Sequence, residues 1–153
     1  MTIPVVVNGD IKTFADAEKA LAASGADAVM VGRAAQGRPW LVGQIGHYLA
    51  TGARLPDPPL AAQRDHLLAL YEDVLAHHGV EIGRRHARKH LAASLDVAAA
   101  TSGASPELLK AGRARLLTAD DPAQVTRAVR DVFDALSNEA GRRDAGSQLR
   151  AAA

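Results

Sequence analysis

The first third of the chain contains two continuous apolar runs with a helix-length segment between them. The first run ends in Val5, Val6 and Val7, three consecutive β-branched residues, and the second covers residues 28–31. Runs without polar alternation are typical of parallel strands that are buried on both faces. Because residues 14–22 carry apolar side chains at helical spacing, the pattern predicts a βαβ unit with parallel strands.

The intervening helix has sequence signals at both ends. Thr13 and Asp16 have the spacing of a capping box, in which each side chain accepts a hydrogen bond from the other residue's backbone. Ser24 and Gly25 predict its end, since glycine adopts the left-handed conformation that commonly follows a helix. The signals therefore confine this helix to the space between the two strands.

After residue 39 the apolar pattern predicts only helices. A helix closed by Gly52 is followed by residues 53–59, where three prolines predict an extended linker and a domain boundary. Four amphipathic segments with short connections follow, which favours a small four-helix bundle. They are residues 60–78, ended by Gly79; residues 81–99; a segment begun by Ser105 and Pro106; and one opened by Asp120 or Asp121 with Pro122 and ending near Leu136.

Residues 138–153 contain few apolar side chains. A segment that cannot bury apolar surface does not offset the entropy lost on ordering. We therefore expect these residues to form a disordered tail.

The polar turns that follow the two predicted strands are the first candidate site. Asn8, Gly9 and Asp10 follow the first strand, and Gly32 and Arg33 follow the second. Glycine allows a ligand to approach the backbone closely, and an arginine can bind an anion through charge-assisted hydrogen bonds. Paired loops after the last two strands are the usual phosphate site of a (β/α)8 barrel. The alternative is that the two glycines only form tight corners.

The second predicted bundle helix carries an unusual concentration of charge. Arg85, Arg88 and Lys89 lie within roughly a third of the helix circumference, and these cations are typical either of a ridge that binds nucleic-acid phosphates or of a solvated face. His86 and His90 have the i, i+4 spacing of a metal site, but no third ligand is evident, so we expect no metal.

Composition limits the classes of protein. A chain of 153 residues forms one ordinary core or two small ones, whereas a complete (β/α)8 barrel needs roughly 250 residues. We therefore expect the C-terminal part of a longer enzyme. No apolar run approaches the ~20 residues of a membrane span, and the two residues before the first predicted strand are too short for a signal peptide, so we expect a cytoplasmic protein. The absence of cysteine excludes disulfides and thiolate metal sites, and a net charge of +1 means that nucleic-acid affinity requires a local patch.

The amino-acid sequence around the two turns resembles that of a known family. Residues 3–40, with Asn-Gly-Asp after the first strand and Gly-Arg after the second, resemble the last two strand–loop units of tRNA-dihydrouridine synthases, in particular the bacterial NifR3-like branch. The resemblance continues into the helical half and covers about residues 3–136; the matching residues there are Gly83, Arg84, Arg88, Lys89 and His90.

The resemblance implies a fold and two sets of site residues. Residues 1–52 would form the last two βα units of a TIM barrel, residues 53–59 a linker, and residues 60–137 a helical tRNA-binding domain. In the family the two turns hold the phosphate of FMN, and the helical domain helps to hold tRNA. The implied cofactor-binding residues are Asn8, Gly9, Asp10, Gly32 and Arg33, and the implied RNA-binding residues are Arg84, Arg85, Arg88, Lys89 and His90.

The resemblance also implies an activity. Dihydrouridine synthases use FMN, reduced by NADPH, to add hydride across the C5–C6 bond of a tRNA uridine that is drawn out of its stack. A cysteine on an earlier barrel loop acts as general acid. This chain has no cysteine, so we expect no catalytic residue in it and no activity without the N-terminal barrel half.

Two alternatives remain open: a non-catalytic RNA-binding or interaction remnant, and the C-terminal part of another FMN-dependent barrel oxidoreductase. The helical extension with Arg88, Lys89 and His90 argues against the latter. Because two parallel strands leave two unpaired edges, we expect residues 60–136 to fold alone, and residues 3–52 to be mobile or packed against another copy.

Overall fold

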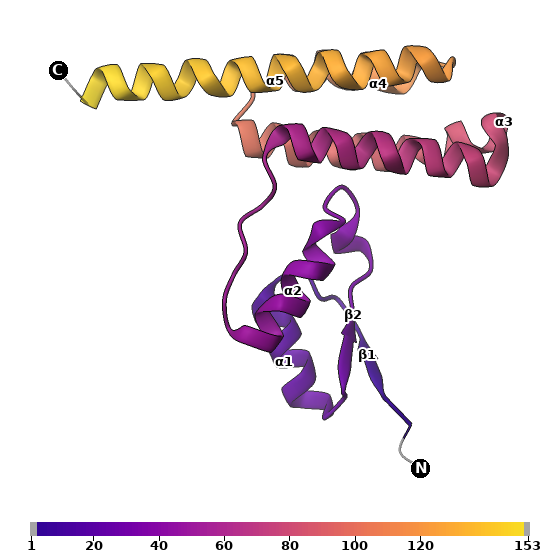
Figure 1. Ribbon diagram of the computed structural model, residues 1–153, viewed down its shortest axis with the longest axis vertical. Helices are drawn as coiled ribbons and strands as arrows, with labels where there is room; N and C mark the ends of the chain where they lie inside the picture. Colours follow the sequence, from indigo (N-terminus) through magenta and orange to yellow (C-terminus); the bar gives the residue numbers. More distant parts are fainter. Residues whose placement is uncertain (1–2, 152–153) are drawn as a thin grey trace. The chain divides into compact units, whose positions relative to one another are not determined.

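The structure is a computed structural model that describes residues 3–151. The chain forms two compact units, one up to Asp57 and one from Pro58 onward, each with its own hydrophobic core. It is mostly helical, with one small two-stranded parallel sheet in the first unit (Figure 1). Among the residues described, no helix has the length and apolar character needed to cross a membrane.

The first unit begins with the predicted βαβ unit. Strands β1 (Val6–Asn8) and β2 (Ala28–Met30) pair in parallel, and helix α1 (Phe14–Ser24) connects them. The predicted capping box is confirmed: Thr13 Oγ1 accepts from the Asp16 N–H at 3.1 Å, and Asp16 Oδ2 accepts from the Thr13 N–H at 2.9 Å. These two bonds satisfy backbone groups that a helix start otherwise leaves unpaired.

The prediction that the strands are buried on both faces is wrong for this unit. Val7 and Val29 are paired in the register and partly buried, and Val29 packs against the first unit's core. Their neighbours Val6 and Met30 point the other way and are 55% and 52% exposed. The difference arises because the described residues supply helices to only one face of the sheet. That core consists of Ile11, Ala17, Leu41 and Ile45.

Helix α2 (Trp40–Thr51) follows a short 3₁₀ turn, η1 (Arg33–Ala35), and ends at Gly52. The extended segment after it is attached to α2. Gln44 Nε2 donates to the Leu55 and Pro56 carbonyls at 3.2 and 3.0 Å. Trp40 Nε1 donates to Asp57 Oδ1 at 3.0 Å. The division between the two units therefore falls immediately after a segment that belongs to the first.

The second unit begins with helix α3 (Leu60–Ser102), which consists of two arms that meet at Gly79. Gly79 has φ 72° and ψ 162°, a backbone conformation that is essentially restricted to glycine. The predicted end of a helix at this residue is confirmed. After Gly79 the chain reverses direction. The close approach of Gly83 to the backbone of Val74 and Leu75 shows that the two arms lie against each other. We call the two antiparallel arms the α3 hairpin (Figure 1).

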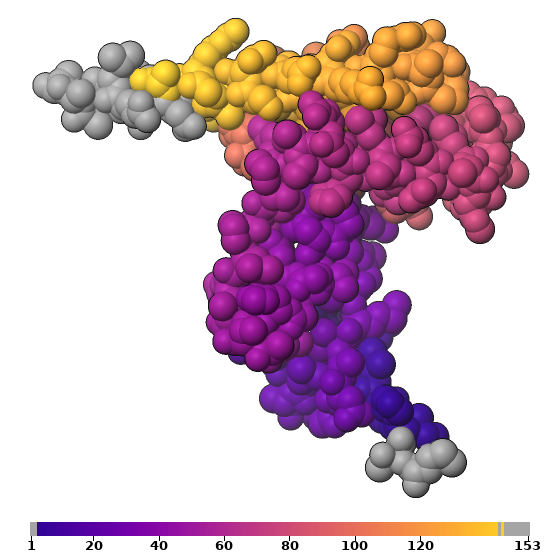
Figure 2. Space-filling view, in the orientation of Figure 1, coloured from indigo at the N-terminus to yellow at the C-terminus, as the bar shows by residue number. Residues whose placement is uncertain are grey.

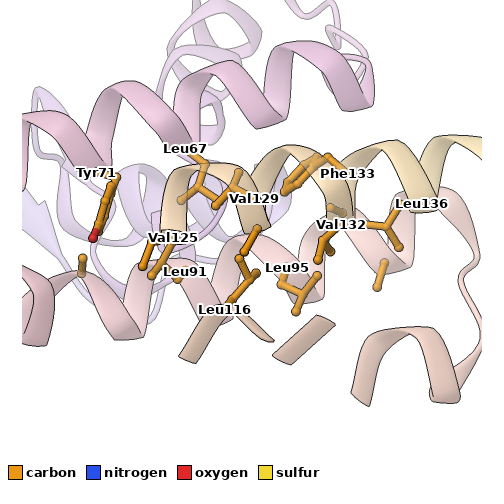
Figure 3. Close-up of a cluster of buried hydrophobic side chains, with 14 residues drawn as sticks. Leu67, Tyr71, Leu91, Leu95, Leu116, Val125, Val129, Val132, Phe133 and Leu136 are labelled. Carbon is orange, nitrogen blue, oxygen red and sulfur yellow. The ribbon is translucent and has the colours of Figure 1, made fainter. Parts of the chain in front are cut away.

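Helices α4 (Pro106–Thr118) and α5 (Pro122–Ala151) pack on the α3 hairpin. The predicted caps are present: Ser105 Oγ accepts from the Leu108 N–H at 3.3 Å, and Asp121 Oδ2 accepts from the Gln124 N–H at 3.0 Å. One apolar core joins the three helices (Figure 3). Its labelled members are Leu67, Tyr71, Leu91, Leu95, Leu116, Val125, Val129, Val132, Phe133 and Leu136.

The structure differs from the expected disordered tail, residues 138–153. Helix α5 continues to Ala151, and residues 152–153 lie outside the described part of the chain. The segment is rich in alanine and arginine, which have high intrinsic helix propensity. Glu139 also accepts from the Ser105 N–H at 3.0 Å and pairs with Arg143 one turn later. Low apolar content therefore removes the stripe that packs on a core, but not the helix.

The close approach of the two arms of the α3 hairpin gives a test of the fold. In Gly83→Ala the added Cβ would lie 2.8 Å from the Val74 carbonyl oxygen and 3.0 Å from Leu75 Cα, so backbone must shift. We expect a loss of about 1–3 kcal/mol in unfolding free energy. In the matched control, Gly141→Ala on α5, the Cβ meets nothing within 4 Å, and we expect a gain of about 0.5–1 kcal/mol. Urea unfolding followed by circular dichroism measures both, and equal effects would contradict the hairpin packing.

Candidate functional site

The two polar turns lie side by side at the carboxyl ends of β1 and β2. They enclose a hollow of about 350 Å³, which we call the strand-end hollow. The structure thus brings together all five residues that the sequence suggested for a cofactor phosphate. The hollow is lined by Asn8, Gly9, Asp10, Ile11, Met30, Gly32, Arg33 and Ala34.

The charges at the strand-end hollow favour an anion. Asp10 pairs with Lys12 at 2.8 Å and with Arg33 at 3.3 Å. The hydrogen bond and charge of Lys12, together with the charge of Arg33, lower the pKa of the Asp10 carboxyl. One carboxylate and two cations leave one positive charge. The Arg33 side chain is 85% exposed, so its guanidinium is free to exchange Asp10 for a bound anion.

The glycines of the two turns leave the backbone at the hollow approachable. A Cβ at Gly9 or at Gly32 would meet no protein atom within 4 Å. Packing within the first unit therefore does not require glycine at either position. A ligand that touches the backbone does require it, because a side chain would occupy that space. The lining contains no aromatic side chain, so it suits a phosphate rather than a ring system.

The basic residues of the second unit lie on the second arm of the α3 hairpin, but its arginines are ion-paired. Arg84 and Arg85 both contact Glu81 Oε1, at 3.1 and 2.9 Å. Arg88 contacts Asp120 Oδ1 at 3.2 Å, and Arg84 contacts the same oxygen. Hydrogen bonds from Arg84 lower the pKa of Glu81 and raise that of Arg84 itself. Arg84 is mostly covered and joins α3 to the connection between α4 and α5.

Fewer cations of this basic surface are accessible to solvent than the sequence indicated. The Arg85 side chain is 68% exposed, and Lys89 is exposed, with no ion pair among the described residues. His90 is partly buried and lies with Leu67 and Tyr71 around a small apolar gap between the arms. Burial, with a smaller effect of the Lys89 charge, lowers the pKa of His90.

The histidines of the second unit are arranged differently from the His86/His90 pair that the i, i+4 spacing suggested. His86 stacks on His78 across the turn of the hairpin, with centroids 4.7 Å apart and planes at 13°, and His77 meets His78 edge-on at 4.6 Å. His86 and His90 therefore do not form a pair. Among the side chains that the structure describes, no group of three histidine, cysteine or carboxylate residues could hold a metal. The stacking was missed because it depends on the reversal at Gly79.

Comparisons of this sequence with known proteins point to one family. The family model described as "Dihydrouridine synthase (Dus)" matches residues 1–110. The chain is 55% identical over 91 residues to tRNA-dihydrouridine synthase B of Xanthomonas campestris, and 45% identical over 91 residues to that of Pseudomonas aeruginosa. It is 51% identical over 89 residues to a probable tRNA-dihydrouridine synthase of Rickettsia conorii.

These alignments cover 58–60% of this chain and 27% of each of the three relatives, so the chain spans about a quarter of their length. The class that the fold and site define is a partial α/β unit with a positively charged hollow at its strand ends, followed by a helical unit with a basic surface. The chain belongs to the dihydrouridine synthase family, and the resemblance read from the sequence is confirmed.

The histidines predict how stability depends on pH. The pKa values of His78 and His90 are lowered from 6.5 by burial and by neighbouring imidazoles or Lys89. The unfolded chain therefore binds more protons, and the unfolding free energy should fall as the pH drops below about 7.5, through the unfolded pKa and on through the lowered folded values. Carboxyls with lowered pKa, such as Asp10, contribute stability that is lost below about pH 5. The double variant His78→Gln/His90→Gln should flatten the curve, measured by urea unfolding at each pH; an unchanged slope would contradict this assignment.

Proposed function

We propose that this chain is the part of a flavin-dependent tRNA-dihydrouridine synthase that holds the FMN phosphate and contacts tRNA. The observation that carries the proposal is the strand-end hollow, with two open glycine positions and a net positive charge. The names of the relatives support the activity. In this proposal β1 and β2 are the last two strands of a TIM barrel, whose C-terminal face is the usual place for a phosphate.

The residues of the hollow fit the phosphate end of FMN. Arg33 would grip the phosphate with charge-assisted hydrogen bonds, while Gly9 and Gly32 allow it to approach the backbone. Asp10 keeps Arg33 and Lys12 beside the hollow until the anion replaces its carboxylate. When bound and reduced by NADPH, FMN supplies the hydride for the C5–C6 bond of uridine. This chain's share is to anchor one end of the cofactor.

The helical unit would supply contacts to the tRNA backbone. Arg85 and Lys89 are the accessible cations, and Arg88 is half-exposed. Arg84 holds the surface in place through Glu81 and Asp120. His90 contributes through its packing between the arms of α3. A tRNA substrate locates the proposed activity in the cytoplasm.

The chain contains no cysteine, so in this proposal the general acid that protonates uridine C5 belongs to another part of the enzyme. The residues of the hollow and of the basic surface bind and orient; none of them performs the proton transfer. The isolated chain should therefore be inactive as a reductase while retaining its phosphate-binding and RNA-binding surfaces.

The cofactor assignment can be tested on the chain itself by ¹H–¹⁵N NMR titration. FMN and inorganic phosphate should both shift the amide signals of Gly9 and Gly32, whereas riboflavin, which lacks the phosphate, should not. Arg33→Ala should weaken FMN binding by about 1.5–3 kcal/mol, the range for a hydrogen bond to a charged group. Lys19→Ala removes a cation from α1, outside the hollow, and should have no effect. Equal shifts with riboflavin, or unchanged affinity in Arg33→Ala, would refute the phosphate assignment.

The RNA assignment predicts a change in salt dependence. Removing either Arg85 or Lys89 by alanine substitution should weaken tRNA binding and reduce the slope of log K against log salt by roughly 1 for each phosphate that is no longer neutralised. Arg130→Ala is the matched control, because Arg130 is an exposed cation on α5, a different helix from the one that carries this surface. Filter binding over a range of salt concentrations measures the slopes. Wild-type slopes in both variants would show that Arg85 and Lys89 do not contact RNA phosphates and belong to an ordinary solvated face.

A further inference from the structure

The turn of the α3 hairpin concentrates side chains that the phosphate contacts do not use. Four of the six histidines of the chain lie in residues 77–90. Three of them form the stack at the turn, and two aliphatic residues stand beside them. We call this group the hairpin tip: His77, His78, Val80, Ile82 and His86.

The hairpin tip is exposed to solvent, although two of its five side chains are aliphatic. Val80 is 54% exposed and Ile82 is 53% exposed, and they are the large hydrophobic residues found exposed in the described part of the second unit. The three imidazoles are also exposed. The glycine-only conformation at Gly79 makes the turn this tight. In Figure 2 the turn, in pink, lies at the surface of the helical unit.

The charge beside the hairpin tip is predominantly positive. Residues 77–90 contain four arginine or lysine residues and one carboxylate, Glu81. Arg84 and Arg85 hold that carboxylate at 3.1 and 2.9 Å. Arg88 and Lys89 follow within two turns of the same arm. Ring faces and aliphatic side chains are thus presented at the end of a cationic strip.

We propose that the hairpin tip binds an unpaired nucleotide of the RNA. A base would stack on the exposed imidazoles while Val80 and Ile82 cover its ring or ribose, and the cations of the same arm hold the adjoining phosphates. Proteins recognise unpaired RNA bases by such stacking on aromatic side chains, histidine included. A second copy of the chain fits less well, because it would bring two cationic strips together. The inference rests on the proposed RNA binding and adds the preference for an unpaired base.

Two RNAs with equal numbers of phosphates test the inference: a stem–loop with an unpaired loop, and a blunt duplex. The first tip variant, Val80→Ser/Ile82→Ser, changes only exposed side chains, so the fold should persist. The second, His77→Ala/His78→Ala, removes the stacking faces. Val42→Ser, on α2, is the matched control, since Val42 is 51% exposed and far from the tip in sequence. Circular dichroism verifies folding, and sedimentation reports self-association.

We expect both tip variants to bind the stem–loop about tenfold more weakly, the scale of one stacked base. Their duplex affinity and salt slope should match those of the wild type. Wild-type stem–loop affinity in both variants would overturn the tip while leaving the phosphate contacts intact. An equal loss on stem–loop and duplex would also overturn it, since no preference for an unpaired base would exist. A loss of self-association instead would assign the tip to a second copy. Absence of RNA binding by the wild type would refute the RNA-binding part of the proposed function, on which this inference rests.

Discussion

The reversal of the chain at Gly79 is the constraint on which the second unit depends. A residue with a side chain rarely adopts φ 72° with ψ 162°, so a longer loop would be needed without glycine here. Because the turn is so short, the two arms of α3 touch from its first residues, and Gly83 fits against Val74 and Leu75. The same reversal sets His86 on His78 and gives the apolar face on which α4 and α5 pack.

The charged side chains of the helical unit divide into some that hold the fold together and some that remain accessible at the surface. Arg84 is mostly covered and bridges Glu81 and Asp120, so removing it would leave Glu81 paired only with Arg85 and Asp120 paired only with Arg88. Arg85 and Lys89 lie outside this bridge and are accessible. A cluster of cations in a sequence therefore overstates the surface that is available to a polyanion. In this chain the covered arginine orders the helix that presents the exposed cations.

The first unit has the opposite balance, since its site is formed but its sheet is covered on only one face. The hollow at the strand ends needs only two parallel strands and their turns, and these are held by α1, α2 and a core of four buried residues. The outward face, with Val6 and Met30, remains exposed. Local geometry thus suffices to bring Asn8 and Asp10 beside Gly32 and Arg33, because strand direction alone places both turns at one edge.

Local rules determined much of this structure from the sequence. The Thr13 capping box, the helix end at Gly79 and the start at Ser105 depend on residues close in the chain, and parallel strands follow from a helical crossover. The family could be recognised from the amino-acid sequence of the two strand-end turns. Only the tertiary structure decided which cations remain free, because Asp120 lies 36 residues from Arg84 and 32 from Arg88. It also paired His86 with His78 instead of His90 and left one face of the sheet exposed. Periodicity identifies the face that a segment buries, but the partner comes from contacts between segments far apart in the sequence.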